Sequence, residues 1–417
     1  MKDYWHSVAL EKEKCNGCTI CLRRCPTEAI RIRDGKAKII KERCIDCGEC
    51  IRVCPYHAKK AFADDLKSIE KYKFKIALVS LPLYGQFGLD MDINKVFNCF
   101  YELGFDMVYD VAYAADLVSS LQSDILKESK TKPLIATLCP AITRLIQIRF
   151  PSLIDNIINL ESPMEIAARL AKQQASKEHC LNLNDIGAFY ITQCPAKITS
   201  IKKPIGIEKS YVDGAIPIKS IYTKLLKIYD DVEKNNKIQK ASGQGIGWAR
   251  VGGQSFALGL EKFLAVDGIE NVIKVLEEIE LGKLNNIDFF EGYACVTGCV
   301  GGPLNVENPF VAKNRIRQLA NNCEKDRLDE AEVAKQLEGI DVGWTEEIKS
   351  LGIMKLDADI EKAIEKMELI DMINKELPGI DCGSCGAPNC HAMAEDVVRG
   401  KAKLEDCIIK MKKKVDK

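Results

Sequence analysis

Cysteine spacing constrains this chain more than any other feature of its sequence. The 417 residues include 19 cysteines, and sixteen of them fall into spaced groups. Two segments, residues 15–26 (CNGCTICLRRCP) and 44–55 (CIDCGECIRVCP), share the pattern C-x2-C-x2-C-x3-C-P. The first residues contain no apolar leader, so we expect clustered thiolates that bind metal rather than form disulfides. Three isolated cysteines are expected to be ordinary buried or surface thiols: Cys99, Cys180 and Cys323.

The two repeated runs predict a pair of iron–sulfur clusters. Two-residue intervals let three thiolates converge on one cubane, and in this pattern the fourth cysteine of each run ligates the other cluster. Alternating apolar and polar residues around Asp34-Gly35 predict a β-hairpin between the runs. Over residues 8–62 the sequence resembles the two-cluster bacterial ferredoxins, which carry electrons. Zinc is the alternative, because CxxC pairs also bind it. We expect two [4Fe–4S] clusters with crossed ligands, one on Cys15, Cys18, Cys21 and Cys54 and the other on Cys44, Cys47, Cys50 and Cys25.

A third cysteine group lies near the other end of the chain. Residues 377–390 read LPGIDCGSCGAPNC, and Gly383 and Gly386 allow tight turns whose N–H groups point inward. The segment resembles a small four-cysteine iron–sulfur module of anaerobic redox proteins, and zinc again stays open as the alternative. His391 is expected at the surface, because four thiolates need no imidazole. We expect one more [4Fe–4S] cluster on Cys382, Cys385, Cys390 and Cys407.

Between these groups, strand and helix patterns alternate. Alternation of this kind indicates an α/β domain with a mostly parallel sheet. We expect strands within residues 73–82, 106–114, 132–140, 185–195 and 287–295, and helices over 93–104, 163–179, 268–284 and 362–379. The expected domains are 1–68 for the two-cluster part, 69–350 for the α/β part and 351–417 for a linker helix with the last module.

Three of the expected strands lead into a cysteine. Cys139, Cys194 and Cys295 follow them, and Cys299 comes four residues after Cys295. Ligand sites in open α/β sheets lie beyond the carboxyl ends of the strands. Four thiolates delivered there from three loops suit a further [4Fe–4S] cluster.

The segments around these cysteines also carry a family resemblance. ATLCPAI, ITQCPAK and EGYACVTGCVGG resemble, in the same order, the three H-cluster-binding motifs of [FeFe]-hydrogenases. The resemblance covers about residues 70–345, and the flanking cluster modules make the whole chain similar to the hydrogenase-like proteins of anaerobic bacteria that are assigned to sensing. It implies a two-lobed H-cluster domain with mostly parallel sheets, preceded by a small α+β ferredoxin-like domain and followed by a small helical Fe–S module.

The resemblance also implies roles for individual residues. Cys139, Cys194, Cys295 and Cys299 would hold the [4Fe–4S] cubane of an H-cluster. Cys299 would bridge to a two-iron subsite that carries CO and CN⁻, and Lys197 would donate a hydrogen bond to a cyanide ligand.

Three positions depart from the family pattern. Leu138 stands where catalytic members carry a cysteine that relays protons, and Thr192 and Tyr293 replace two methionines. Because H₂ turnover needs a proton donor of matched pKa, losing the relay predicts slow turnover. Glu291 and Tyr293 are candidates for another proton path.

The glycine-rich segment SGQGIGWARVGGQS, residues 242–255, allows two interpretations. It contains a GxGxG pattern that occurs in nucleotide-binding loops, but no expected strand leads into it. We favour a loop that closes beside the cluster, with Trp248 in the wall of the site.

These patterns predict an iron–sulfur redox protein that binds H₂ or slowly interconverts it with protons and electrons, as a slow hydrogenase or an H₂ sensor. The alternative is a non-catalytic electron-transfer or scaffold protein that holds only a cubane. Expected partners are H₂, protons and a redox partner such as ferredoxin or a signalling protein. Lys+Arg and Asp+Glu both number 60, so nucleic acid is not expected, and no apolar run is long enough to span a membrane. A cytoplasmic location is expected.

Overall fold

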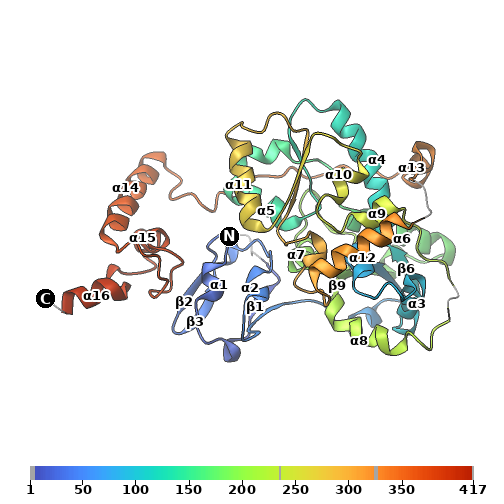
Figure 1. The fold of residues 1–417 in the computed structure, drawn as a ribbon, viewed down its shortest axis with the longest axis horizontal. Coiled ribbons are helices and arrows are strands. Elements are labelled where there is room, and N and C mark those ends of the chain that lie inside the picture. Colours follow the sequence, from blue (N-terminus) through green and yellow to red (C-terminus); the bar gives the residue numbers. More distant parts are fainter. Residues whose placement is uncertain (1–4, 234–235, 324–326, 416–417) are drawn as a thin grey trace. The chain divides into compact units, whose positions relative to one another are not determined.

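The computed structural model describes residues 5–233, 236–323 and 327–415, and the chain forms two compact units (Figure 1). The small unit joins the two ends of the chain, Met1–Ala61 and Ser350–Lys417, and the large unit is Phe62–Lys349. The expected domain limits at residues 68 and 350 stay predictions. Among the described residues, no helix combines the length and the apolar character that a membrane crossing requires.

The first part of the small unit consists of two short antiparallel strand pairs and two short helices. Strands β1 (Val8–Leu10) and β4 (Lys59–Ala61) pair, and β2 (Ile30–Arg33) pairs with β3 (Lys36–Ile39). Asp34 and Gly35 have φ of +53° and +68°, which matches a hairpin turn with both central residues in the left-handed region. The expected hairpin is therefore confirmed. Helices α1 (Ile20–Arg23) and α2 (Glu49–Arg52) each carry one cysteine of a run.

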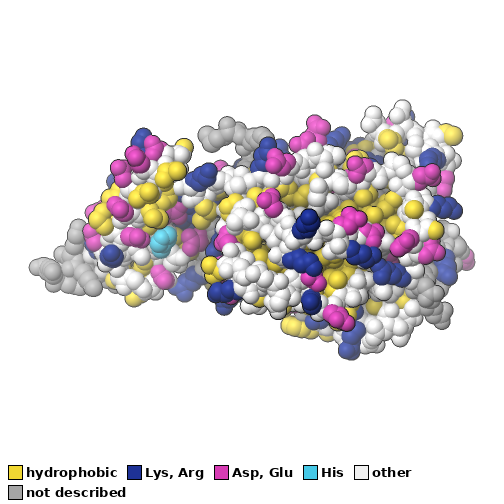
Figure 2. All heavy atoms as spheres, turned by 90° about the horizontal axis from the view of Figure 1, so that it is seen from above, with side chains coloured by type: hydrophobic (Ala, Val, Ile, Leu, Met, Phe, Trp, Pro, Cys, Tyr) yellow, Lys and Arg dark blue, Asp and Glu magenta, His cyan; other side chains and the backbone are white. Residues whose placement is uncertain are grey.

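The second part of the small unit is helical. It contains α14 (Ile360–Glu376), α15 (Cys390–Val398) and α16 (Ile408–Val415). Ile370, Leu377, Met393 and Cys407 belong to its small apolar core. Several apolar side chains of α14 remain exposed, and apolar atoms gather on this part of the surface in Figure 2. The expected fold of a small α+β part and a small helical module is confirmed.

The large unit contains two parallel sheets. One has the strand order β6-β5-β8-β9, with β6 at Met107–Asp110, β5 at Phe74–Val79, β8 at Ile186–Thr192 and β9 at Gly214–Pro217. The other has the order β10-β11-β7, with β10 at Phe263–Asp267, β11 at Phe289–Tyr293 and β7 at Leu134–Ile135. Each sheet is the centre of one lobe, so the expected two-lobed α/β architecture is confirmed.

Helices connect and cover these strands (Figure 1). They are α3 (Ile93–Glu102), α4 (Val111–Glu128), α5 (Pro140–Arg149), α6 (Pro163–His179), α7 (Pro195–Lys202), α8 (Ile218–Ile228), α9 (Gly243–Gly247), α10 (Gly253–Ala257), α11 (Ile269–Glu280), α12 (Pro309–Asn321) and α13 (Glu330–Gln336). Short 3-10 helices occupy Lys12–Lys14, Lys41–Arg43, Leu66–Lys71, Leu81–Gly85, Pro151–Asn156, Leu183–Asp185, Cys299–Gly301 and Leu404–Asp406.

The expected strand over residues 106–114 is wrong in its second half. The strand ends at Asp110, and α4 begins at Val111. Asp110 caps the helix, because its carboxylate accepts a hydrogen bond from the backbone N–H of Ala112 at 3.1 Å. The apolar run that follows is buried around most of the helix, and such a run cannot be distinguished from a buried strand by its pattern alone. The strand expected at 132–140 is likewise reduced to β7 (Leu134–Ile135).

Candidate functional site

Three loops of the large unit present the cysteines at the carboxyl ends of parallel strands. Cys139 caps the N-terminus of α5 after β7, and Cys194 caps α7 after β8. Pro140 and Pro195 stand in the first turns of these helices, where the missing N–H costs nothing and the fixed φ suits the helix. Cys295 follows β11 by two residues. Because β8 belongs to one sheet and β7 and β11 to the other, both lobes contribute to the site.

The four thiols lie beside one another, with Cys295 buried and the other three half-buried. Burial and, after it, the charges of Cys295 and Cys139 raise the pKa of Cys194 to about 12, although Lys197 acts to lower it. Burial, followed by the charges of Cys139 and Cys194, raises the pKa of Cys299 well above its usual range. Four largely desolvated thiolates at one place are expensive unless a cationic centre compensates them, so this group of thiols fits a metal centre.

The spread of the sulfur atoms separates a cluster from a single ion. A tetrahedral zinc ion with Zn–S bonds near 2.3 Å would hold its sulfurs about 3.8 Å apart. Within the described ranges, the one group of three or more ligand atoms that all lie within 4.8 Å of one another is His6, Cys44 and Asp46. In the part of the chain that the structure describes, no four-cysteine set meets this limit, and the wider spacing of the sulfur atoms suits a [4Fe–4S] cubane better than a single zinc ion. Asp46 itself accepts a hydrogen bond from the backbone N–H of Val8 at 3.0 Å.

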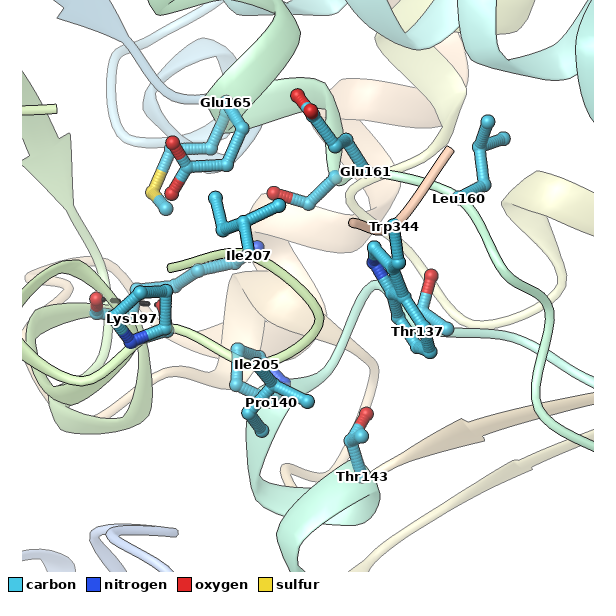
Figure 3. A pocket seen from close by; sticks show the side chains of 14 residues that line it. Thr137, Pro140, Thr143, Leu160, Glu161, Glu165, Lys197, Ile205, Ile207 and Trp344 are labelled. Carbon is cyan, nitrogen blue, oxygen red and sulfur yellow. Dashed lines mark hydrogen bonds between the residues drawn. The ribbon is translucent and has the colours of Figure 1, made fainter. Parts of the chain in front are cut away.

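Lys197 lies on α7, three residues after Cys194, and its side chain is 2% exposed. It lines a cavity of about 50 Å³ together with Thr137 and Pro140, which flank the Cys139 loop (Figure 3). Its charge lowers the pKa of both Cys194 and Cys299 against the larger effect of burial. A buried ammonium needs anions around it, and this one has thiolates on one side and carboxylates on another.

Those carboxylates, Glu161 and Glu165, were not found from the sequence (Figure 3). Glu165 accepts hydrogen bonds from Ser210 Oγ at 2.7 Å and from the backbone N–H of Tyr211 at 2.9 Å, and burial raises its pKa. Glu161 is 3% exposed, and burial raises its pKa to about 7 although Arg169 donates to it at 2.8 Å. In the sequence, the only local feature of these two glutamates is their position around the start of a helix. That position is explained equally well by a role in capping the helix.

Two of the residues that depart from the family pattern have definite structural roles. The Thr192 hydroxyl donates to the backbone carbonyl of Cys194 and accepts from its N–H, both at 3.2 Å, so it holds the cysteine loop. The Tyr293 hydroxyl donates to Glu291 at 2.7 Å and accepts from Gln254 Nε2 at 3.1 Å. Ser255 Oγ donates to Glu291 at 2.6 Å, which completes a buried network with the glycine-rich loop. Leu138 is buried, at 6% exposure.

The glycine-rich segment packs directly on the last cysteine motif. Val251 N–H donates to the carbonyl of Thr297 at 3.1 Å, and Val300 N–H donates to the carbonyl of Ala249 at 3.2 Å. Gly298 has φ of +93°, and a Cβ there would lie 2.6 Å from the nitrogen of Val251. The segment includes the short helices α9 and α10 rather than one continuous loop, and its place beside a cluster stays a prediction. Trp248 is fully buried and donates its indole N–H to Ser119 at 2.9 Å.

In the small unit, the cysteines approach one another in the crossed arrangement. Burial raises the pKa of Cys21 to about 11, and its neighbouring thiols include Cys18, Cys15 and Cys54. Burial raises the pKa of Cys50 to about 12, and Cys25 lies beside it. Both of these thiols also lie beside Cys44. The fourth cysteine of each run therefore lies with the other run.

Backbone N–H groups point at two of these thiols. Ala29 N–H donates to Cys25 Sγ at 3.2 Å, and Ala58 N–H donates to Cys54 Sγ at 3.3 Å. N–H donors of this kind surround cluster sulfurs and tune the cluster's potential.

The C-terminal cysteines also gather. Cys385 lies beside Cys407 and Cys382, and burial raises its pKa. Cys390 begins α15 and packs against the same apolar core as Cys407. His391 is exposed, as expected. The isolated cysteines lie elsewhere: Cys99 is buried in α3, Cys180 is exposed at the end of α6, and Cys323 is half-buried.

Family models match all three parts of the chain. The model described as "Iron only hydrogenase large subunit, C-terminal domain" matches residues 76–259 and 224–303. A "4Fe-4S dicluster domain" model matches residues 14–58, and a model for an Fe-S cluster segment matches residues 377–409. Iron–sulfur modules therefore flank the hydrogenase-like domain.

Two of the curated relatives are hydrogenases of low identity. The chain is 23% identical over 296 residues to "Iron hydrogenase 1" of Clostridium pasteurianum, covering 57% of this chain and 51% of that protein. It is 27% identical over 215 residues to the "Periplasmic [Fe] hydrogenase large subunit" of Nitratidesulfovibrio vulgaris, covering 47% of this chain and 51% of that protein. The chain thus spans about half the length of the curated relatives it matches.

A solved structure shares the fold. An [FeFe]-hydrogenase, described in a study of how oxygen degrades the two-iron part of its H cluster, matches with a TM-score of 0.51 at 15% identity. The match covers 69% of this chain and 94% of that one. The hydrogenase family model spans more than half of the 417 residues and includes Cys139, Cys194, Cys295 and Cys299. This protein therefore belongs to the family of the iron-only hydrogenase large subunit, C-terminal domain.

Proposed function

We propose that this chain binds H₂, or slowly interconverts it with protons and electrons, at an H-cluster held by four cysteines of the large unit. The ligands would be Cys139, Cys194, Cys295 and Cys299, with Cys299 also bridging to the two-iron subsite. The observation that carries this proposal is the convergence of four cysteine thiols, one buried and three half-buried, beside the buried Lys197. When bound, the H-cluster supplies the redox chemistry of H₂.

The chain's own residues would position and limit that chemistry. The ammonium of Lys197 is a compact donor suited to an anionic cyanide ligand. Leu138 carries no ionisable group, so the residue before Cys139 cannot pass a proton. A positioned proton donor is worth about two to four orders of magnitude, which makes slow turnover or sensing the expected behaviour. Glu291 and Tyr293 remain candidates for another proton path.

Electrons would leave or reach the site through iron–sulfur clusters of the small unit. Their proposed ligands are the crossed sets Cys15, Cys18, Cys21, Cys54 and Cys44, Cys47, Cys50, Cys25, and the C-terminal set Cys382, Cys385, Cys390, Cys407. An external redox partner, such as a ferredoxin or a signalling protein, and a cytoplasmic location belong to the same proposal.

Infrared spectroscopy tests the proposal. The chain is purified without oxygen, matured with the two-iron subsite, and examined for CO and CN⁻ stretching bands, which we expect to appear. Lys197→Ala should shift the CN⁻ bands or prevent their appearance. Lys202→Ala is the matched control, because Lys202 lies on the same helix with its side chain 40% exposed. Absence of all bands in the matured native chain would refute the two-iron site.

The second candidate function is a non-catalytic protein whose site holds only a cubane. Tyr293 favours it, because its hydroxyl is engaged by Glu291 and Gln254 inside the protein. This candidate predicts a full complement of [4Fe–4S] signals with no CO or CN⁻ bands after maturation. The same infrared experiment, together with iron analysis, separates the two.

A further inference from the structure

The two ends of the chain are joined by buried ion pairs. Arg31 of β2 donates to both carboxylate oxygens of Asp396, at 2.6 and 3.0 Å, and Arg33 donates to the same carboxylate at 2.9 Å. Arg43 donates to Glu395, the neighbouring residue on α15. Arg31, Arg43, Glu395 and Asp396 are each at most 6% exposed. A bidentate contact between a guanidinium and a carboxylate fixes the orientation of the two groups as well as their position.

Backbone contacts extend this junction to the cysteine loops. Ile32 N–H donates to the carbonyl of Gly386 at 2.9 Å, as one strand would to another. Gly386 has φ of +79°, and a Cβ there would lie 2.1 Å from the carbonyl oxygen of Ile32. Only glycine fits this approach. The loop between Cys385 and Cys390 is therefore held against the hairpin by its own backbone.

The junction brings two proposed clusters to neighbouring positions. Arg23 donates to the carbonyl of Cys382 at 2.5 Å, and Arg33 donates to the carbonyl of Cys385 at 3.3 Å. A Cβ on Gly383 would lie 3.5 Å from Leu22, the residue that follows Cys21. Residues adjacent to ligands of the first ferredoxin cluster thus contact residues adjacent to ligands of the C-terminal cluster.

We propose that the C-terminal cluster is a direct redox partner of the first ferredoxin cluster, the one on Cys15, Cys18, Cys21 and Cys54. One electron passes from one cluster to the other, so that one is oxidised by one electron as the other is reduced, and no bond or proton is exchanged. The ion pairs of Asp396 and Glu395 hold the two clusters in place for this transfer. The inference rests on the proposed cluster ligands but not on the H-cluster.

Electron paramagnetic resonance of the full chain tests this coupling. The chain is reconstituted with iron and sulfide, left without the two-iron subsite, and reduced with dithionite. Reduced clusters that lie close together split and broaden one another's signals. Asp396→Lys places a cation against Arg31 and Arg33, so we expect it to remove the part of the splitting that comes from the C-terminal cluster, at unchanged iron content.

Three further variants complete the design. Asp34→Lys reverses a charge at the tip of the same hairpin, where the side chain is 86% exposed, and should leave the spectrum unchanged. The charge exchange Arg31→Asp/Asp396→Arg should restore the splitting. Gly386→Ala should remove it without any change of charge, which keeps the test valid if Asp396→Lys does not fold.

The possible outcomes are distinct. Native and Asp396→Lys chains with equal iron content and identical spectra would overturn the inference. An iron content that does not fall in Cys385→Ser/Cys390→Ser would overturn the C-terminal ligand set, and the coupling with it. Failure to form the H-cluster would count against the proposed function. It would not affect these spectra, because they are recorded without the two-iron subsite.

Discussion

At the residue scale, the proposed function makes Leu138 the residue expected to limit turnover. It precedes Cys139 and is buried at 6% exposure, so neither an ionisable group nor open solvent supplies a proton from this position. Leu138→Cys introduces a thiol there and should raise H₂ production by about tenfold or more if the missing relay limits turnover. H₂ release by the matured chain with an artificial electron donor is the measurement.

A remote thiol provides the control for this variant. Leu153→Cys also replaces a buried leucine, at 5% exposure, but in the Pro151–Asn156 turn, and should leave the rate unchanged. An unchanged rate in Leu138→Cys itself would mean that proton delivery at this position is not limiting.

Glu161 gives the second prediction at this scale. Burial raises its folded pKa to about 7 from 4.5, so its contribution to stability is complete below pH 4.5 and is lost as pH rises through the folded value. Linkage makes this loss about 3 kcal/mol between roughly pH 5 and 8. Denaturant unfolding across this range should show the fall in the native protein and a smaller fall in Glu161→Gln. If the free energy of unfolding falls with pH equally in the native protein and in Glu161→Gln, Glu161 does not titrate as its burial implies.

At the scale of elements, the glycine-rich loop and the last cysteine motif form one packed structure. A Cβ at Gly298 would lie 2.6 Å from Val251 N and 2.9 Å from the carbonyl carbon of Arg250. Gly298→Ala must therefore separate the loop from the motif, and we expect the large unit to lose its cluster while the small unit keeps its own. Iron analysis of the reconstituted chain measures this loss.

Gly259→Ala is the matched comparison for Gly298→Ala. Gly259 also has positive φ, +64°, but a Cβ there meets nothing within 4 Å. This variant tests the cost of a positive φ without the collision and should retain full iron content. If both variants lose iron equally, strain rather than close packing holds the motif.

At the scale of the whole molecule, the small unit depends on a charge pair between distant parts of the chain. Arg43 and Glu395 have side-chain exposures of 6% and 8%. Burial acts to raise the pKa of Glu395, but its bonds to Arg43 and Arg399 outweigh this and lower it, so the carboxylate is ionised at neutral pH. Glu395→Gln would leave Arg43 buried without its counter-charge, which costs about 3 kcal/mol in the free energy of unfolding.

Two comparisons isolate the buried pair from a general loss of charge. Replacing both partners, in Arg43→Met/Glu395→Met, should be close to neutral, because no uncompensated charge remains. Glu376→Gln breaks an exposed pair with Lys410, in which the Glu376 side chain is 59% and the Lys410 side chain 26% exposed, and should change the free energy of unfolding much less than Glu395→Gln does. Denaturant unfolding gives all three values, and similar values for Glu395→Gln and Glu376→Gln would contradict the buried role.

Local spacing in the sequence determined the two cysteine runs of the small unit, the hairpin at Asp34-Gly35 and the alternation that predicts parallel sheets, because cysteine intervals, turn residues and periodicity are short-range properties. The start of α4 at Val111 could not be predicted from the sequence, because a fully buried helix and a buried strand have the same apolar pattern. Tertiary structure alone decided that Glu161, Glu165 and Lys197 share one cavity. It alone also paired Arg31 with Asp396 across 365 positions, because in a linear sequence a charge that will be buried against a distant partner looks the same as one that will face water.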